Sequence, residues 1–151
     1  MVRQFGEEVV DEMMGAISSS VPGIKTYYKT IMEEVKQKGY LESYFGRRRR
    51  FPLITQANRK EVEKQAVNFP IQSAGTDIML LCMLHLWELK DKWGIWPFWP
   101  VHDSITMSSP SPEIMPEIRK ELEDYSFELV NGIVPFIWKF DWGITWAMNK
   151  A

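Results

Sequence analysis

A long helical pattern from about Asn58 to Asp91 constrains the fold of this chain more than any other stretch. Beyond Thr76 the pattern is apolar on every side of a helix, over Ile78, Met79, Leu80, Leu81, Cys82, Met83, Leu84 and Leu86. A helix that is apolar all round has to be buried, so this half is expected to form the core. Pro70 removes a backbone donor and disfavours helical geometry at the residue before it. We therefore expect a kink or a break into two helices at Pro70.

Two amphipathic helices are expected before this segment. The first covers residues 7–20, where Val9, Met13 and Ile17 recur every four residues, and Pro22-Gly23 ends it. The second covers residues 24–37, and Gly39 is a plausible stop because glycine adopts the left-handed conformation that ends many helices.

The remaining chain predicts strands and one further helix. Residues 40–54 suggest a small hairpin, and Trp93–Val101 with Ile105–Ser108 suggest a second one. Ser111-Pro112-Glu113 is a helix start signal, and the helix should end near Gly132, with glutamates that face water: Glu113, Glu117, Glu121 and Glu123. Val134–Asp141 is expected to form a final strand. This order indicates an α+β fold with an antiparallel sheet, the second hairpin plus the C-terminal strand, packed by helices.

Composition limits the classes of function. A chain of 151 residues that is 45% hydrophobic is about the size of one domain and is not disordered. The net charge of −2 requires any nucleic-acid binding to come from local patches. Cys82 is the only cysteine, which excludes disulfides and cysteine-based zinc sites within the chain. The longest apolar run, Ile78–Leu84, is too short to cross a bilayer, and we expect a soluble intracellular protein.

Three polar features are candidates for function. His102 and Asp103 lie at the tip of the second predicted hairpin, where an ordinary turn is the simpler interpretation. Arg47, Arg48, Arg49 and Arg50, beside aromatic residues, could grip phosphates or could be solvated surface. Lys64, Asn68 and Gln72 are spaced by four, so they share one helix stripe. That stripe suits contacts to phosphate, sugar and base edges, or it is a solvated face.

Several segments resemble family A DNA polymerases, the DNA polymerase I type, in the family's order. Gly39-Tyr40-Leu41-Glu42-Ser43-Tyr44-Phe45-Gly46-Arg47-Arg48-Arg49 is similar to the family's Gly-Tyr-x-x-Thr/Ser-x-x-Gly-Arg-Arg segment. Residues 63–77, Glu-Lys-Gln-Ala-Val-Asn-Phe-Pro-Ile-Gln-Ser-Ala-Gly-Thr-Asp, resemble its Glu-Arg-x-Ala-x-Asn-x-Pro-x-Gln-Gly-Thr-Ala-Ala-Asp. Val101-His102-Asp103-Ser104 resembles its Val-His-Asp-Glu, and Gly143 with Trp146 resembles its C-terminal ending. The likeness covers nearly the whole chain.

The resemblance implies a role for each matched position. Asp103 would be a palm carboxylate that helps to hold the two catalytic Mg²⁺ ions, and His102 would lie against the primer terminus. Lys64, where the family usually has arginine, would contact the primer–template minor groove together with Asn68 and Gln72. Arg47, Arg48 and Arg49 would lie in the fingers-to-palm connection and reach DNA. Residues 1–57 would hold the distal fingers helices and this connection, and residues 58–151 a partial palm.

The resemblance also identifies what this sequence lacks. The family's other essential aspartate, in an Asp-Tyr-Ser-like motif, and the helix that grips the nucleotide triphosphate have no counterpart here. Ser104 stands where the family has glutamate, and its hydroxyl is a possible accessory ligand.

We therefore expect the C-terminal part or split subunit of a DNA-directed DNA polymerase. Such a chain would be inactive alone and completed by an N-terminal remainder, primer–template DNA and dNTP in the cytoplasm of a bacterium or phage-infected host. The alternatives are a stand-alone, non-catalytic nucleic-acid-binding module and a domain for protein contacts.

Overall fold

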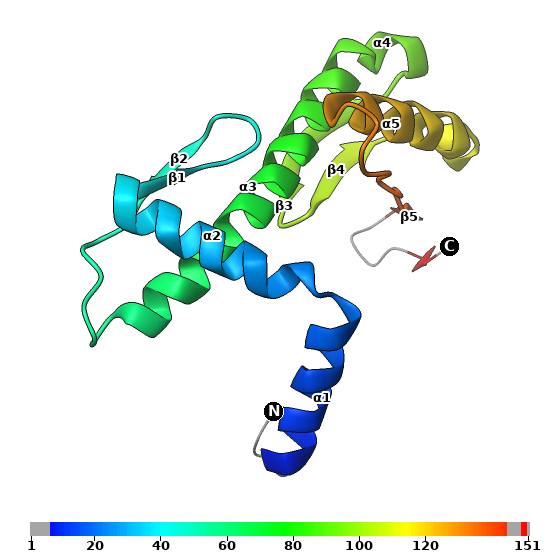
Figure 1. The fold of residues 1–151 in the computed structure, drawn as a ribbon. Helices are drawn as coiled ribbons and strands as arrows, with labels where there is room; N and C mark the ends of the chain where they lie inside the picture. Colours follow the sequence, from blue (N-terminus) through cyan, green and yellow to red (C-terminus); the bar gives the residue numbers. More distant parts are fainter. Residues whose placement is uncertain (1–6, 145–148, 151) are drawn as a thin grey trace. The chain divides into compact units, whose positions relative to one another are not determined.

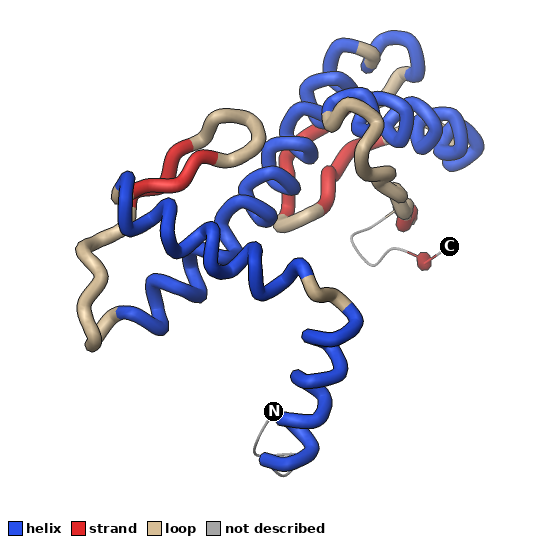
Figure 2. The backbone as a smooth tube through the Cα atoms, viewed as in Figure 1, coloured by secondary structure: helices blue, strands red, loops and turns tan. Residues whose placement is uncertain are grey.

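A computed structural model describes residues 7–144 and 149–150 (Figures 1 and 2). The chain divides into two compact units, residues 1–73 and residues 74–151. The elements follow in the order α1 (Glu7–Ser20), α2 (Gly23–Lys38), β1 (Tyr40–Glu42), β2 (Arg48–Arg50), α3 (Arg59–Glu88), α4 (Lys90–Trp93), β3 (Trp96–Val101), β4 (Ser104–Ser108), a 3₁₀ turn (Pro112–Ile114), α5 (Met115–Leu129), β5 (Asp141–Trp142) and β6 (Asn149–Lys150). Helix α3 thus contributes its first half to one unit and its second half to the other.

The first unit combines α1, α2, the β1–β2 hairpin and the start of α3. Its core is formed by apolar side chains of α2, the hairpin and α3, namely Ile31, Val35, Leu41, Phe51, Val62, Ala66, Val67 and Phe69. Gly39 ends α2 as predicted, because its φ of 72° allows its N–H to reach the Val35 carbonyl. Strand β1 begins at Tyr40, directly after Gly39. Leu41, the next residue, is part of the core.

Helix α3 is continuous through Pro70. Of the two outcomes expected there, a kink or a break into two helices, the break is wrong. Proline has no N–H for the carbonyl of Ala66. The Tyr27 hydroxyl of α2 donates to the next carbonyl, that of Val67, at 2.9 Å. Val67 and Phe69 are both buried beside the proline. Packing on this side therefore holds a helix that local propensity disfavours.

The second unit packs the rest of α3 with α4, the β3–β4 hairpin and α5. Its buried side chains include Ile78, Met79, Cys82, Leu86, Ile95, Ile118 and Leu122. Leu84 is nevertheless 61% exposed. The expectation that the apolar half of α3 is buried on every side is therefore wrong at this position. Among the described helices, none has a stretch long and apolar enough for a membrane span.

The strands form three separate antiparallel pairs, β1–β2, β3–β4 and β5–β6, rather than one sheet (Figure 2). The mixed helix and antiparallel strand class is confirmed in this coarser form. The C-terminal strand expected over Val134–Asp141 reaches ladder geometry only at Asp141–Trp142, and there it pairs with β6 instead of the β3–β4 hairpin.

Residues 134–140 show why that strand is missing. Phe136, Trp138 and Phe140 are half buried, whereas Ile137 is 80% exposed, so the burial alternates as a strand requires. The backbone N–H of Trp138, however, donates to the Glu123 carboxylate at 3.3 Å and not to a neighbouring strand. The alternating pattern is therefore real, but within the described residues no strand lies beside it to form a ladder.

Candidate functional site

The turn between β3 and β4 carries the first group of candidate residues. Val101 pairs with Ser104 in the ladder, so His102 and Asp103 form a two-residue loop. Ser104 Oγ donates a hydrogen bond of 2.8 Å to the Val101 carbonyl oxygen and closes this loop. Both loop side chains are exposed. The turn thus presents an imidazole and a carboxylate to solvent.

His102 has a left-handed backbone with φ of 55°. Positive φ suits two-residue hairpin loops because it matches the twist of the strands. Glycine adopts it freely, whereas a residue with a side chain pays roughly 1–2 kcal/mol. A strained residue at an exposed tip is a candidate functional position.

Strand β3 approaches this tip irregularly. Its register with β4 shifts between Pro97 and Trp99, which is the signature of a bulge. Pro97 and Pro100 carry no N–H and are tolerated in an edge strand or at a bulge. A bulge increases the local twist of a hairpin, and this one lies in the strand that leads to the tip.

Asp103 supplies hard carboxylate oxygens of the kind that Mg²⁺ prefers. In the parts of the chain that are described, residues 7–144 and 149–150, no three His, Cys, Asp or Glu side chains are grouped so that they could hold a metal ion. The tip therefore offers one carboxylate, with the Ser104 hydroxyl directed at the backbone of its own turn.

The first half of α3 carries the second group. Lys64, Asn68 and Gln72 are all exposed, whereas Val62, Ala66 and Phe69 on the other side are buried in the first unit. The predicted polar stripe is thus present as one ammonium and two amides along an accessible helix face. It can offer donors to phosphates and both donors and acceptors to base edges.

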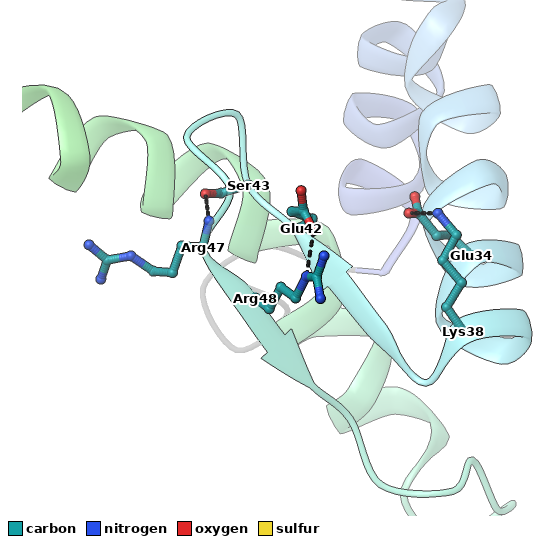
Figure 3. Close-up of polar contacts among 6 residues, drawn as sticks. All are labelled: Glu34, Lys38, Glu42, Ser43, Arg47 and Arg48. Atoms are coloured by element: carbon teal, nitrogen blue, oxygen red, sulfur yellow. Dashed lines mark hydrogen bonds and ion pairs between the residues drawn. The ribbon is translucent and has the colours of Figure 1, made fainter.

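The β1–β2 hairpin carries the third group, the arginines (Figure 3). Arg48 Nε donates to Glu42 Oε2 at 2.6 Å, and its guanidinium lies 5.2 Å from the Tyr40 ring centroid. The backbone N–H of Arg47 donates to Ser43 Oγ at 3.1 Å, while its side chain extends away from the other residues drawn in Figure 3. The turn is therefore held by backbone and serine contacts, which leave the Arg47 side chain exposed.

Arg49 turns to the opposite face of the same ladder. Its Nη2 donates to Gln65 Oε1 on α3 at 2.6 Å, and Gln65 Nε2 in turn donates to Glu61 at 2.6 Å. Its guanidinium also lies 5.4 Å from the Phe51 ring centroid. Arg49 thus connects the hairpin to the helix that bears Lys64.

Sequence reasoning missed Glu42, Ser43 and Gln65 as partners of the arginines. A hairpin register would have revealed Glu42, because it lies directly opposite Arg48, and opposite charges across a ladder attract. Gln65 had no such signal, because its contact depends on how the hairpin packs on α3.

A second missed cluster links α3 to α5. His85 Nε2 lies 2.8 Å from Glu121 Oε1, and the His85 and Tyr125 rings stack with centroids 4.0 Å apart. Burial, together with Cys82 and Glu88, raises the pKa of Tyr125. Glu113 and Glu117 are exposed as expected, but Glu121 and Glu123 turn inward to His85 and Trp138. A single histidine in an apolar helix segment was the available signal.

The C-terminal candidates are only partly described. Gly143 follows β5 and is exposed. Trp146 lies outside the described residues.

Comparison with known proteins gives a consistent result. The model of DNA polymerase family A matches residues 4–148. DNA polymerase I of Streptococcus pneumoniae serotype 4 is 34% identical over 134 residues, which are 85% of this chain and 15% of that protein. DNA polymerase I of Bacillus caldotenax is 33% identical over 136 residues, with 87% and 15% covered. The chain therefore spans about 15% of the length of these relatives.

A solved structure has the same fold. The POL domain of Pol1 from M. smegmatis, in complex with DNA primer-template and dNTP, superposes with a TM-score of 0.70 at 21% identity. The match covers 90% of this chain and 24% of that one. The expected family resemblance is confirmed by these three findings together.

Proposed function

The chain belongs to DNA polymerase family A, and from this membership we propose that it is the C-terminal part or a split subunit of a DNA-directed DNA polymerase. It contributes one catalytic metal-binding carboxylate, Asp103, and contacts to primer–template DNA. The observation that carries the proposal is the two-residue tip, where Asp103 is exposed in a chain that the family model matches almost from end to end.

The donor set at the tip fits Mg²⁺ as part of a larger site. Mg²⁺ commonly takes one or two carboxylates together with substrate phosphates, and Asp103 is one such ligand. In two-metal sites, the ions activate the attacking hydroxyl and stabilise the leaving group. Ser104 is an accessory candidate at most, since its hydroxyl already closes the turn. We propose that His102, beside Asp103, lies against the primer terminus.

The polar helix face has a different task. We propose that Lys64, Asn68 and Gln72 contact the duplex near the growing primer end, with Lys64 on phosphate and the two amides on sugar or base edges. Their exposure along one stripe of α3 supports this role. Arg47, Arg48 and Arg49 add positive charge next to the start of this helix.

Catalysis requires parts that this sequence does not supply. The proposal assigns the second aspartate and the triphosphate-binding helix to the N-terminal remainder of the polymerase. With that assignment, residues 1–57 belong to the distal fingers and their connection, and residues 58–151 to the palm. The isolated chain is then inactive, and the assembled enzyme takes dNTP and primer–template DNA in the cytoplasm of a bacterial cell or phage-infected host.

A chimera provides the test. Residues 4–148 replace the matched segment of the S. pneumoniae enzyme, and primer extension is measured with Mg²⁺. Asp103→Asn should lower the rate by on the order of 10³-fold, because a metal ligand contributes several kcal/mol to charge stabilisation in the transition state. Asp124→Asn, which changes an exposed carboxylate on α5, is the matched control. Equal activity of the two variants would refute the assignment of Asp103.

A further inference from the structure

Helices α3 and α5 of the second unit are joined by a histidine that has no part in the proposed contacts to DNA or metal. His85 Nε2 lies 2.8 Å from Glu121 Oε1, and the two side chains are 17% and 35% exposed. The His85 ring also stacks on the Tyr125 ring, with centroids 4.0 Å apart and an angle of 8° between the ring planes. Helix α5 therefore holds this imidazole both at its edge and on its face.

The groups around the imidazole are carboxylates or neutral side chains. On α5 they are Glu121 and Tyr125. On α3 they are Cys82 and Glu88, which lie three residues before and after His85 and hence on the same side of the helix. Burial raises the pKa of the Cys82 thiol to about 12 and also raises the pKa of Tyr125, so both groups stay neutral near pH 7. The charges in this cluster are thus negative.

Protonation of the imidazole changes the strength of the contact to α5. A neutral imidazole donates an ordinary hydrogen bond from Nε2, whereas an imidazolium makes the same contact as an ion pair. A hydrogen bond between charged groups is roughly twice as strong as a neutral one, and the face of an aromatic ring attracts a cation. Burial opposes a charge, but the His85 side chain keeps part of its exposure to solvent. The carboxylate and the ring of α5 therefore both favour the imidazolium.

We propose that His85, Glu121 and Tyr125 form a pH-sensitive clamp between α3 and α5, which holds the two helices more firmly when the imidazole is protonated. Histidine is the side chain that ordinarily changes its charge between pH 5 and 8. The added attraction is complete at the acidic end of this range and is lost as the pH rises. The clamp does not rest on the proposed function, because Asp103 and the polar stripe of α3 take no part in it.

The test follows the unfolding of the whole chain in denaturant at about pH 5.5 and about pH 8, where glutamates are ordinarily ionised and histidine changes its charge. All seven tryptophans lie at or after Trp87, so their fluorescence follows the second unit. His85→Gln keeps an amide donor for Glu121 but cannot take a charge. The advantage of the wild type over His85→Gln in the folding equilibrium constant should be about fivefold larger at the lower pH.

Further variants identify the groups that cause this gain at low pH. Glu121→Gln should abolish the gain, because the imidazolium then loses its carboxylate. Asp124→Asn, which changes an exposed carboxylate of the same helix, is the matched control and should keep the gain. Tyr125→Phe should also keep it, whereas Tyr125→Leu should reduce it because the aromatic face is lost. His102→Gln, at the exposed tip of the other hairpin, should keep the gain as well, which assigns it to His85.

A double-mutant cycle of His85→Gln and Glu121→Gln isolates the pair from all other groups that titrate. The coupling between the two positions should be about fivefold larger at the lower pH, expressed as a ratio of folding equilibrium constants. A role in packing alone predicts the same coupling at both pH values, because the shapes of the side chains do not change with pH.

Each outcome decides the proposal. The clamp is refuted if the wild type and His85→Gln respond alike to pH, if Glu121→Gln keeps the gain, or if the coupling is equal at both pH values. If Glu121→Gln does not fold, the comparison of the wild type with His85→Gln still decides. Refutation of the clamp leaves the Asp103→Asn comparison in the chimera untouched. Conversely, full activity of that chimera variant would refute the assignment of Asp103 and leave the clamp standing.

Discussion

The two longer hairpins of this chain use polar side chains in opposite ways. In β1–β2 the arginines engage their own unit, with Arg48 on Glu42 and Arg49 on Gln65. In β3–β4 the tip residues His102 and Asp103 are exposed, and only Ser104 bonds back to the turn. In the first hairpin, Arg48 and Arg49 are thus held by side chains of their own unit, whereas the second hairpin has both tip side chains exposed to solvent.

The two hairpins therefore differ in what holds their polar side chains in place. A charge that is paired within its unit loses part of its attraction for a ligand but gains a defined place. A carboxylate at a tight, closed turn is defined by the backbone alone. We therefore expect mutations in the first hairpin to act mainly on stability and mutations at the second tip to act mainly on activity.

The largest expected effect is on the anchoring of the first hairpin. Leu41→Ala should lower the free energy of unfolding by about 2–5 kcal/mol, because it leaves a cavity at a fully buried position. Ile105→Ala on β4, which is only half buried, should cost roughly 1–2 kcal/mol. Chemical denaturation followed by far-UV circular dichroism measures both values.

Tryptophan fluorescence adds a test of locality. All seven tryptophans lie at or after Trp87 and hence in the second unit. The Leu41→Ala loss should therefore be larger by circular dichroism than by fluorescence. Leu53→Ala, at a position 87% exposed, should stay within about 0.5 kcal/mol of the wild type. Equal costs for Leu41 and Leu53 would contradict the anchoring role.

Each of the two hairpins has a serine in its turn, and the two serines differ in burial. Ser43 is buried and accepts the Arg47 N–H, so Ser43→Ala leaves a donor without its partner and should cost about 1–2 kcal/mol. Ser104 is exposed, so Ser104→Ala should cost less than about 1 kcal/mol but should lower primer extension by the chimera. A larger stability loss for Ser104→Ala than for Ser43→Ala would reverse the contrast between the hairpins.

The sequence predicted the local elements well because their signals are local. The bounds of α1 and α2, the stop at Gly39 and the tip at His102-Asp103 all follow from periodicity and turn residues. The family itself was recognisable from three short motifs and their spacing. The exposed stripe of Lys64, Asn68 and Gln72 followed from helical geometry alone.

What failed depended on contacts between distant residues. Continuity at Pro70 rests on packing near Tyr27 and Val67, and no local rule contains that packing. The prediction of the final strand was wrong because alternating burial shows which side chains face inward but does not show whether a neighbouring strand is present. The contact between Arg49 and Gln65 joins positions 16 residues apart, so only the fold could reveal it.

The strained backbone of His102 at the second tip can be relieved or increased by substitution. His102→Val should lower the free energy of unfolding by roughly 1 kcal/mol, because a β-branched side chain fits φ of 55° poorly. His102→Gly should be close to neutral, since relief of strain offsets the added entropy of the unfolded chain. Both variants should lower primer extension by the chimera. Full activity of the glycine variant would show that the turn needs the backbone and not the imidazole.

The smallest effect is a pH dependence within the first unit. Burial, and then the neighbouring Tyr28, raises the pKa of Tyr27, whose hydroxyl donates to the Val67 carbonyl. The folded chain favours the neutral form of Tyr27. The contribution of Tyr27 to stability is therefore complete below the pKa of the unfolded chain, about 10. It is lost as the pH rises through the higher pKa of the folded chain. Tyr27→Phe should lower the free energy of unfolding by up to about 1 kcal/mol at pH 8. It should also reduce the loss of stability at alkaline pH that circular dichroism measures. The fluorescence transition, which follows the second unit, should keep its own alkaline dependence from Tyr125. If Tyr27→Phe flattened both transitions equally, the two units would unfold as one, and the separate treatment of the two hairpins would fail.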